Sequence, residues 1–188
     1  MRYAFVAMGA SLGGLNAVRT VLSALPSFFP MPVALVQHRM TDAGGELAFV
    51  LRESCALPVR EAEDKAPIEA GVVFIAPPGY HLLVEGDHFA LSTEEPVEWA
   101  RPSVNVLFET AAESYGRRLI AVVLSGTGED GAAGLAAVER HGGMALVQEP
   151  ETAYANGMPR AAGQAMRNEM TLPLAAIGPQ LVALSRQA

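Results

Sequence analysis

Apolar and polar residues follow two alternating patterns along the chain. Short runs of consecutive apolar residues, bounded by glycine, proline or polar residues, predict buried strands. Between these runs, apolar residues three or four positions apart predict amphipathic helices. The predicted strands are 3–8, 32–38, 58–62, 72–76, 119–125, 144–148 and 170–174; the predicted helices are 15–25, 45–54, 104–115, 132–140, one that begins near 158 and one that Gly178-Pro179 opens.

Strands and helices alternate almost throughout, and this order predicts the fold class. We expect an α/β fold: a doubly wound, mostly parallel sheet with helices on both faces and right-handed crossovers. Residues 81–91 differ, because a turn at Glu85-Gly86-Asp87 separates two short apolar runs, and we expect one antiparallel β-hairpin there. With neither a repeat nor a linker in the sequence, residues 1–188 are expected to form a single domain.

Composition narrows the function classes. The chain is 51% hydrophobic and 18% charged, as globular proteins are. A net charge of −7 argues against a nucleic-acid partner. The single cysteine, Cys55, excludes an intramolecular disulfide, suits a reducing compartment and is expected to be a packing residue. No apolar run predicts membrane insertion, and a first strand starting near Tyr3 leaves no room for a signal peptide, so we expect a cytoplasmic protein.

The first strand–turn–helix unit carries candidate chemistry. Gly9, Ser11 and Gly13 have the Gly-x-Ser-x-Gly spacing of a nucleophile elbow. A Cβ at either glycine would crowd the strand against the helix. The free N–H groups of the following helix favour negative charge that develops beside the serine. The alternative is a glycine-rich turn that holds a phosphate, as in many open α/β sheets.

Two further polar residues follow predicted strands in the same way. His38 ends the second predicted strand, and Asp130 follows the strand at 119–125. If these strands are neighbours of the first, Ser11 would attack, His38 would take its proton, and Asp130 would orient the imidazole. Asp130 could instead cap the helix that follows it, or do both. The order Ser, His, Asp excludes the α/β-hydrolase family but not the mechanism.

The turn at 126–131 also fits a rival function. Its Gly-x-Gly-x-x-Gly spacing matches the dinucleotide fingerprint, and Glu149 lies about where the ribose-binding acid is expected. However, Glu129 and Asp130 would repel a pyrophosphate held by this loop. We therefore expect no nucleotide cofactor.

The remaining histidines are interpreted as surface or structural residues, and no metal site is expected. His81 and His88 fall in the predicted hairpin and His141 ends a helix. The sequence lacks the His-x-x-x-His and Cys-x-x-Cys spacings of metal ligands.

Six segments together resemble the catalytic domain of the chemotaxis protein-glutamate methylesterase family, CheB. They occur in order over essentially the whole chain, and although each alone is a weak motif, the set is specific. The segments are 9–14, 36–38, 76–81, 101–105, 124–134 and 157–161.

The resemblance implies a doubly wound α/β domain that hydrolyses glutamate methyl esters on the cytoplasmic helices of chemoreceptors, often with deamidation of glutamine. Water is the second substrate and no cofactor is required. The family's nucleophile, base and acid map onto Ser11, His38 and Asp130, and its oxyanion-hole backbone N–H falls at Thr127. Because the imidazole must be unprotonated to act as a base, activity should fall below about pH 6–7.

Three departures from the family pattern bear on function. Thr127 stands where members commonly carry methionine, and Asn105 where they carry aspartate. The usual N-terminal receiver domain is absent from this sequence. The chain is therefore expected to act without phosphorylation control, to be a fragment of a longer protein, or to be regulated by a separate partner. The alternative to an esterase is a non-catalytic receptor-docking or scaffold module on the same fold.

Overall fold

The central element is a parallel β-sheet, seen in a computed structural model that describes residues 2–39, 46–167 and 170–187. Within these residues seven strands pair in the order β3-β4-β2-β1-β7-β8-β9, and every pair is parallel. The strands are β1 (Phe5–Ala10), β2 (Val33–Gln37), β3 (Val59–Glu61), β4 (Val73–Ile75), β7 (Leu119–Val123), β8 (Met144–Gln148) and β9 (Met170–Leu172).

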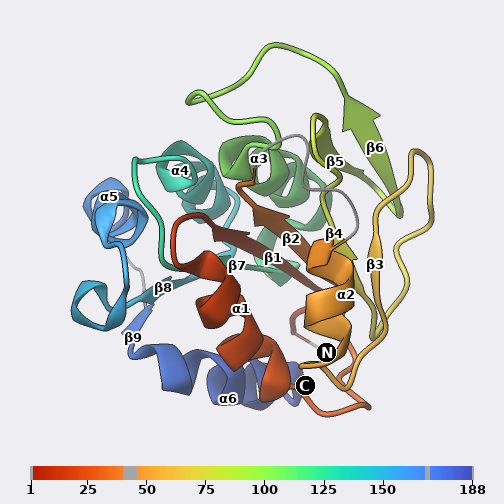
Figure 1. The fold of residues 1–188 in the computed structure, drawn as a ribbon, viewed down its shortest axis with the longest axis horizontal. Helices are drawn as coiled ribbons and strands as arrows, with labels where there is room; N and C mark the ends of the chain where they lie inside the picture. The colour runs from red at the N-terminus through yellow and green to blue at the C-terminus, as the bar shows by residue number, and fades with distance from the viewer. Residues whose placement is uncertain (1, 40–45, 168–169, 188) are drawn as a thin grey trace.

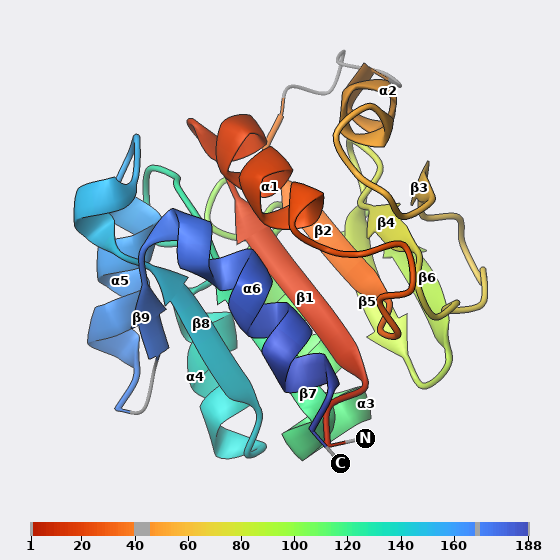
Figure 2. The ribbon, with the colours of Figure 1, turned by 90° about the horizontal axis from the view of Figure 1, so that it is seen from below.

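Helices cover both faces of this sheet (Figures 1 and 2). They are α1 (Gly14–Ser23), α2 (Glu46–Arg52), α3 (Val104–Tyr115), α4 (Ala132–Arg140), α5 (Gly157–Ala165) and α6 (Leu174–Ser185). Helices α1, α2 and α6 pack on one face with Val6 and Met8 of β1. Helices α3, α4 and α5 pack on the other with Phe5 and Ala7. Successive residues of β1 thus point to opposite buried faces, which is why the buried strands are continuously apolar.

The predicted hairpin forms a separate two-stranded sheet. Strands β5 (His81–Glu85) and β6 (His88–Ser92) pair antiparallel. Phe89 and Val84 join the core cluster that contains α3, and the hydroxyl of Thr110 on α3 accepts a hydrogen bond from the Val84 N–H at 3.1 Å. The α/β fold class, the sheet and the hairpin are as predicted.

The start of the last helix was wrongly predicted. Helix α6 begins at Leu174, so Gly178 and Pro179 lie inside it. Proline removes one helical hydrogen bond there. A Cβ at Gly178 would lie 2.6 Å from the Ala24 Cβ and 2.8 Å from the Val21 carbonyl oxygen, so this glycine allows close helix contact rather than helix initiation.

The helix predicted at 45–54 is α2, Glu46–Arg52, and Gly45 lies outside the described residues.

Among the residues that the structure describes, no helix has the length and apolar character needed to cross a membrane.

Candidate active site

Strand β1 lies between β2 and β7, and this order brings three distant segments to one edge of the sheet. Ser11 follows β1, His38 follows β2, and the turn that contains Asp130 follows β7. Because the strands are parallel, their carboxyl ends share that edge. One pocket of about 740 Å³ is bordered by all three residues.

The turn that carries Ser11 is held on both sides of its peptide backbone. The Ser11 N–H donates to the carbonyl oxygen of Ser125 at 2.9 Å. Its carbonyl oxygen accepts hydrogen bonds from the Gly14 N–H and from Nε2 of Gln37, both at 2.8 Å. The serine is therefore fixed to β7, to α1 and to the end of β2 at once.

The glycines beside the serine are required for a reason other than the predicted one. A Cβ at Gly9 would overlap the Val104 side chain at the start of α3, on the opposite face from α1. Gly13 has φ 75°, and a Cβ there would lie 2.5 Å from the Tyr154 Cβ. The crowding they prevent involves α3 and the loop of Tyr154, not the helix that follows the turn.

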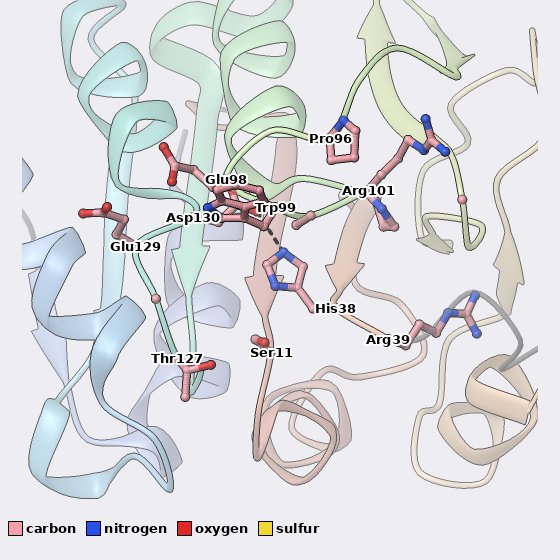
Figure 3. A pocket seen from close by; sticks show the side chains of 14 residues that line it. Ser11, His38, Arg39, Pro96, Glu98, Trp99, Arg101, Thr127, Glu129 and Asp130 are labelled. Atoms are coloured by element: carbon pink, nitrogen blue, oxygen red, sulfur yellow. Dashed lines mark hydrogen bonds and ion pairs between the residues drawn. The ribbon is translucent and has the colours of Figure 1, made fainter.

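His38 and Asp130 are in direct contact (Figure 3). Nε2 of His38 donates to Oδ2 of Asp130 at 2.8 Å. The carboxylate accepts three more hydrogen bonds, from the Ser103 hydroxyl at 2.8 Å and from the N–H groups of Val104 at 2.7 Å and Asn105 at 2.9 Å. Asp130 is buried, and these four donors compensate for removing its charge from water.

Asp130 caps a helix, but not the one that follows it. The two backbone N–H groups that donate to its carboxylate, those of Val104 and Asn105, lie in the first turn of α3. The N-terminus of α4 is capped instead by Oδ1 of Asn105, which accepts from Gly131 N–H at 2.9 Å and Gly134 N–H at 2.8 Å. The first turn of α4 would have to present free N–H groups to a pyrophosphate. With Asn105 occupying two of them, the dinucleotide interpretation loses its structural basis.

The imidazole has one nitrogen left for catalysis. Because Nε2 is bonded to the carboxylate, Nδ1 is the nitrogen available to a serine, the reverse of the trypsin-type arrangement. Figure 3 shows the His38 ring between Asp130 and Ser11. Within the described residues the Ser11 hydroxyl makes no hydrogen bond to this ring. Such contacts commonly tighten only when substrate binds.

Backbone donors lie beside the serine. Thr127 borders the same pocket as Ser11 and His38, and its side chain is exposed. In the described part of the chain, neither its N–H nor that of Leu12 donates a hydrogen bond. The N–H that follows a nucleophile is a common member of an oxyanion hole. Leu12 is thus a candidate that the sequence prediction missed.

Two buried polar residues that support the site were also missed. Nε2 of Gln37 donates to the carbonyl oxygens of both Ser11 and His38, at 2.8 and 3.0 Å. The Ser125 hydroxyl donates to the Leu12 carbonyl at 2.8 Å and accepts from the Ala155 N–H at 3.0 Å. A polar residue that ends an otherwise apolar strand is the sequence signal that could have identified them.

The remaining histidines have structural or surface roles, as predicted. His81 is buried; its Nδ1 accepts from the Ser103 N–H at 3.2 Å, and its Nε2 donates to the Glu95 carbonyl at 3.1 Å. His88 pairs with carboxylates on the hairpin surface, and His141 bonds to its own helix. Among the described residues no group of three or more His, Cys, Asp or Glu side chains is placed to hold a metal ion.

An imidazole bonded to a buried carboxylate, in a pocket that a serine also borders, is the arrangement that serine hydrolases use. The fold and the site therefore fit that class of enzyme. The family model for CheB methylesterase matches residues 6–181, and the chain belongs to this family.

Similar proteins agree with this assignment. The chain is 42% identical to a Leptospira interrogans protein provisionally named protein-glutamate methylesterase/protein-glutamine glutaminase, over 99% of this chain and 97% of that protein. It is 40% identical to the Myxococcus xanthus protein-glutamate methylesterase FrzG over 96% of this chain, but spans only 54% of that relative. The Thermotoga maritima CheB methylesterase catalytic domain superposes with a TM-score of 0.93 at 32% identity, over 98% of this chain and 100% of that one.

Proposed function

We propose that this protein is a serine hydrolase that removes methyl groups from glutamate methyl esters on the cytoplasmic helices of chemoreceptors. The observation that carries the proposal is the 2.8 Å contact between His38 and Asp130 in the pocket that Ser11 borders. The family and the names of the relatives support methylesterase activity. Since the receptor helices are cytoplasmic, the proposal includes a cytoplasmic location.

In the first half of the reaction, Oγ of Ser11 attacks the ester carbonyl carbon while Nδ1 of His38 accepts the hydroxyl proton. Asp130 holds the ring through Nε2 and stabilises the imidazolium that forms. The carbonyl oxygen becomes negative, and the N–H groups of Thr127 and Leu12 are the donors proposed to bind it. When the tetrahedral intermediate collapses, the imidazolium protonates the leaving oxygen and methanol departs.

In the second half, water replaces methanol. Nδ1 of His38 takes a proton from water, hydroxide adds to the acyl-serine, and collapse returns the proton to Oγ of Ser11. The products are the glutamate side chain and the free enzyme. Attack on a glutamine amide would follow the same path with ammonia as the leaving group, as the names of several relatives indicate for those proteins.

The decisive experiment measures methanol release from receptor that carries radiolabelled methyl groups. We expect Ser11→Ala to abolish release while its circular dichroism and melting temperature stay within error of the parent. Ser23→Ala is a matched control, because this exposed serine ends α1 at its far end from the turn. Methanol release by Ser11→Ala at the parent rate would show that the serine assignment is wrong.

The non-catalytic alternative is separated from the enzyme by a fluorophosphonate probe. Such probes phosphonylate activated serines, so the parent protein should be labelled once, at Ser11, as mass spectrometry of its peptides would show. Absence of labelling, combined with receptor binding, would favour the docking or scaffold module.

A further inference from the structure

Eight large hydrophobic side chains of the described residues are exposed: Leu12, Leu15, Phe28, Phe49, Tyr80, Val97, Trp99 and Tyr154. Four of these, Leu12, Leu15, Trp99 and Tyr154, lie around the pocket and the turn of Ser11. Trp99 borders the pocket together with Ser11, and Leu12 and Leu15 line the adjoining hollow on the other side of the serine. Tyr154 packs against Gly13 in the same turn. Grouped exposure of this kind is typical of a surface that binds another molecule.

Trp99 is the extreme member of this group, with 99% of its surface exposed. It lies at the tip of a two-residue turn between Val97 and Ala100, whose N–H and C=O groups pair at 3.1 and 2.9 Å. Glu98 and Trp99 have φ values of 49° and 62°, a left-handed backbone that favours Asn-Gly. A large side chain that is exposed to water on a strained turn does not stabilise the fold. Strain that persists without stabilising the fold indicates a functional constraint.

The loop that carries this turn, residues 93–101, connects β6 to α3 (Figure 1), and side-chain hydrogen bonds hold its base. The Arg101 guanidinium donates to the carbonyl oxygens of Thr93 and Glu94 at 2.8 and 2.9 Å. Buried His81 donates to the Glu95 carbonyl at 3.1 Å. These bonds restrain the loop that carries Trp99, which reduces the entropy that ordering this loop on binding would cost.

We propose that Trp99 is the anchor that docks the helix of the receptor substrate across the mouth of the pocket. This rests on the proposed function, since it concerns the polypeptide that carries the ester. A glutamyl side chain places its ester carbon only three carbon–carbon bonds from its Cα. For the ester to reach Ser11, the substrate backbone must lie close to the rim of the pocket, and Trp99 is one of the residues that form this rim (Figure 3).

Arg39 and Arg101 also line the pocket, but the exposed charges on the loop of Trp99 and on the α4 side are acidic, and they define the matching substrate surface. Glu98 adjoins Trp99, Glu94 and Glu95 belong to the same loop, and Glu129 borders the pocket on the α4 side; all are exposed. The complementary helix surface presents an apolar side chain to the indole and cationic side chains to these carboxylates.

Trp99 is the only tryptophan in the sequence, so the tryptophan fluorescence of the protein comes from this residue alone and changes when it is docked. A Ser11→Ala variant, which binds without turnover, is titrated with a methylated chemoreceptor cytoplasmic fragment that contains no tryptophan. Transfer of the indole from water to an apolar contact should shift its emission to shorter wavelength, with saturation. Unchanged emission at concentrations where the fragment is bound would overturn the proposal.

Kinetics supply a second, independent measurement. The ratio of kcat/KM for methylated receptor to kcat/KM for p-nitrophenyl acetate should fall about tenfold in Trp99→Ala. The fall should come chiefly from a higher KM for receptor. Trp99→Phe, which keeps an aromatic ring, should restore much of the ratio. Phe28→Ala is the matched control, because this exposed aromatic precedes β2 at the opposite edge of the sheet and should leave the ratio unchanged.

The outcomes separate this proposal from the one on which it rests. If the parent hydrolyses receptor esters and Trp99→Ala has the same substrate ratio, docking by Trp99 is wrong and the proposed function stands. If the parent does not hydrolyse receptor esters, the proposed function is wrong and this proposal fails with it.

Discussion

Asn105 and Asp130 cap each other's helices. The Asn105 N–H, in the first turn of α3, donates to Oδ1 of Asp130 at 2.9 Å. Oδ1 of Asn105 in turn accepts from the N–H of Gly131, the residue after Asp130 and directly before α4, at 2.9 Å. The carboxylate that orients His38 is thus also a structural link between two helices on one face of the sheet.

This relationship gives Asp130→Asn two effects. One amide oxygen cannot accept the four hydrogen bonds that the carboxylate accepts, and the amide N–H groups would oppose donors. We expect kcat for ester hydrolysis to fall about 10³–10⁴-fold and the free energy of unfolding to fall by about 1–3 kcal/mol. Steady-state kinetics and urea unfolding measure the two effects.

The control for that substitution is Asp87→Asn, at an exposed position in the hairpin turn, which should change neither quantity by more than error. If Asp130→Asn loses stability but retains its kcat, Asp130 is only a helix cap.

A second prediction concerns Gln37, which bridges the nucleophile turn and the base. Gln37→Met keeps the length of the side chain but removes the donor to the Ser11 and His38 carbonyls. We expect kcat to fall about 10–100-fold with KM within about threefold, because small errors in position reduce the rate more than binding. The buried carbonyls left without this donor should lower stability by about 1–3 kcal/mol.

Gln164→Met, on the exposed side of α5, is the matched control and should leave kcat unchanged. A Gln37→Met enzyme with parental kcat and reduced stability would assign Gln37 a purely structural role.

Local patterns predicted the elements but not their mutual contacts. Strands such as β1 and β7 were recognisable because buried parallel strands are continuous apolar runs. The start of α6 was missed because Pro179 is normally a helix start or break, whereas here it lies inside the helix, directly after the glycine that approaches α1. Sequence also suggested that Asp130 could cap the helix that follows it, whereas its carboxylate accepts from the N–H groups that open α3, a contact between segments far apart in the chain.

The candidate site shows the same division. Ser11, His38 and Asp130 could be selected because each follows a predicted strand, but their convergence depended on a strand order that the local pattern does not contain. The turn at Glu98 and Trp99 had no sequence signal, because Glu-Trp is not a dipeptide that favours a left-handed backbone.

A third prediction concerns the single thiol. Cys55 packs beside the core that contains α1, and burial raises its pKa, with a smaller opposing effect from the hydrogen bond that the Leu57 N–H donates to Sγ. A raised pKa means less thiolate at any given pH, and only the thiolate is alkylated. Iodoacetamide at pH 8 should therefore label native Cys55 roughly fivefold or more slowly than the urea-unfolded chain, as followed by mass spectrometry. Equal rates would contradict the packing role.

The fourth prediction compares two substitutions at Trp99. Its φ of 62° costs a non-glycine residue about 1–2 kcal/mol, and because the indole is exposed, removing it costs little packing. Glycine adopts this backbone without strain but has about 0.5–1 kcal/mol more entropy to lose on folding. Trp99→Gly should therefore be more stable than Trp99→Ala by up to about 1 kcal/mol, a melting-temperature difference of about 2–4 °C by circular dichroism. Both variants should lose receptor preference equally, since both lack the indole. If Trp99→Gly melts below Trp99→Ala, the turn is not strained.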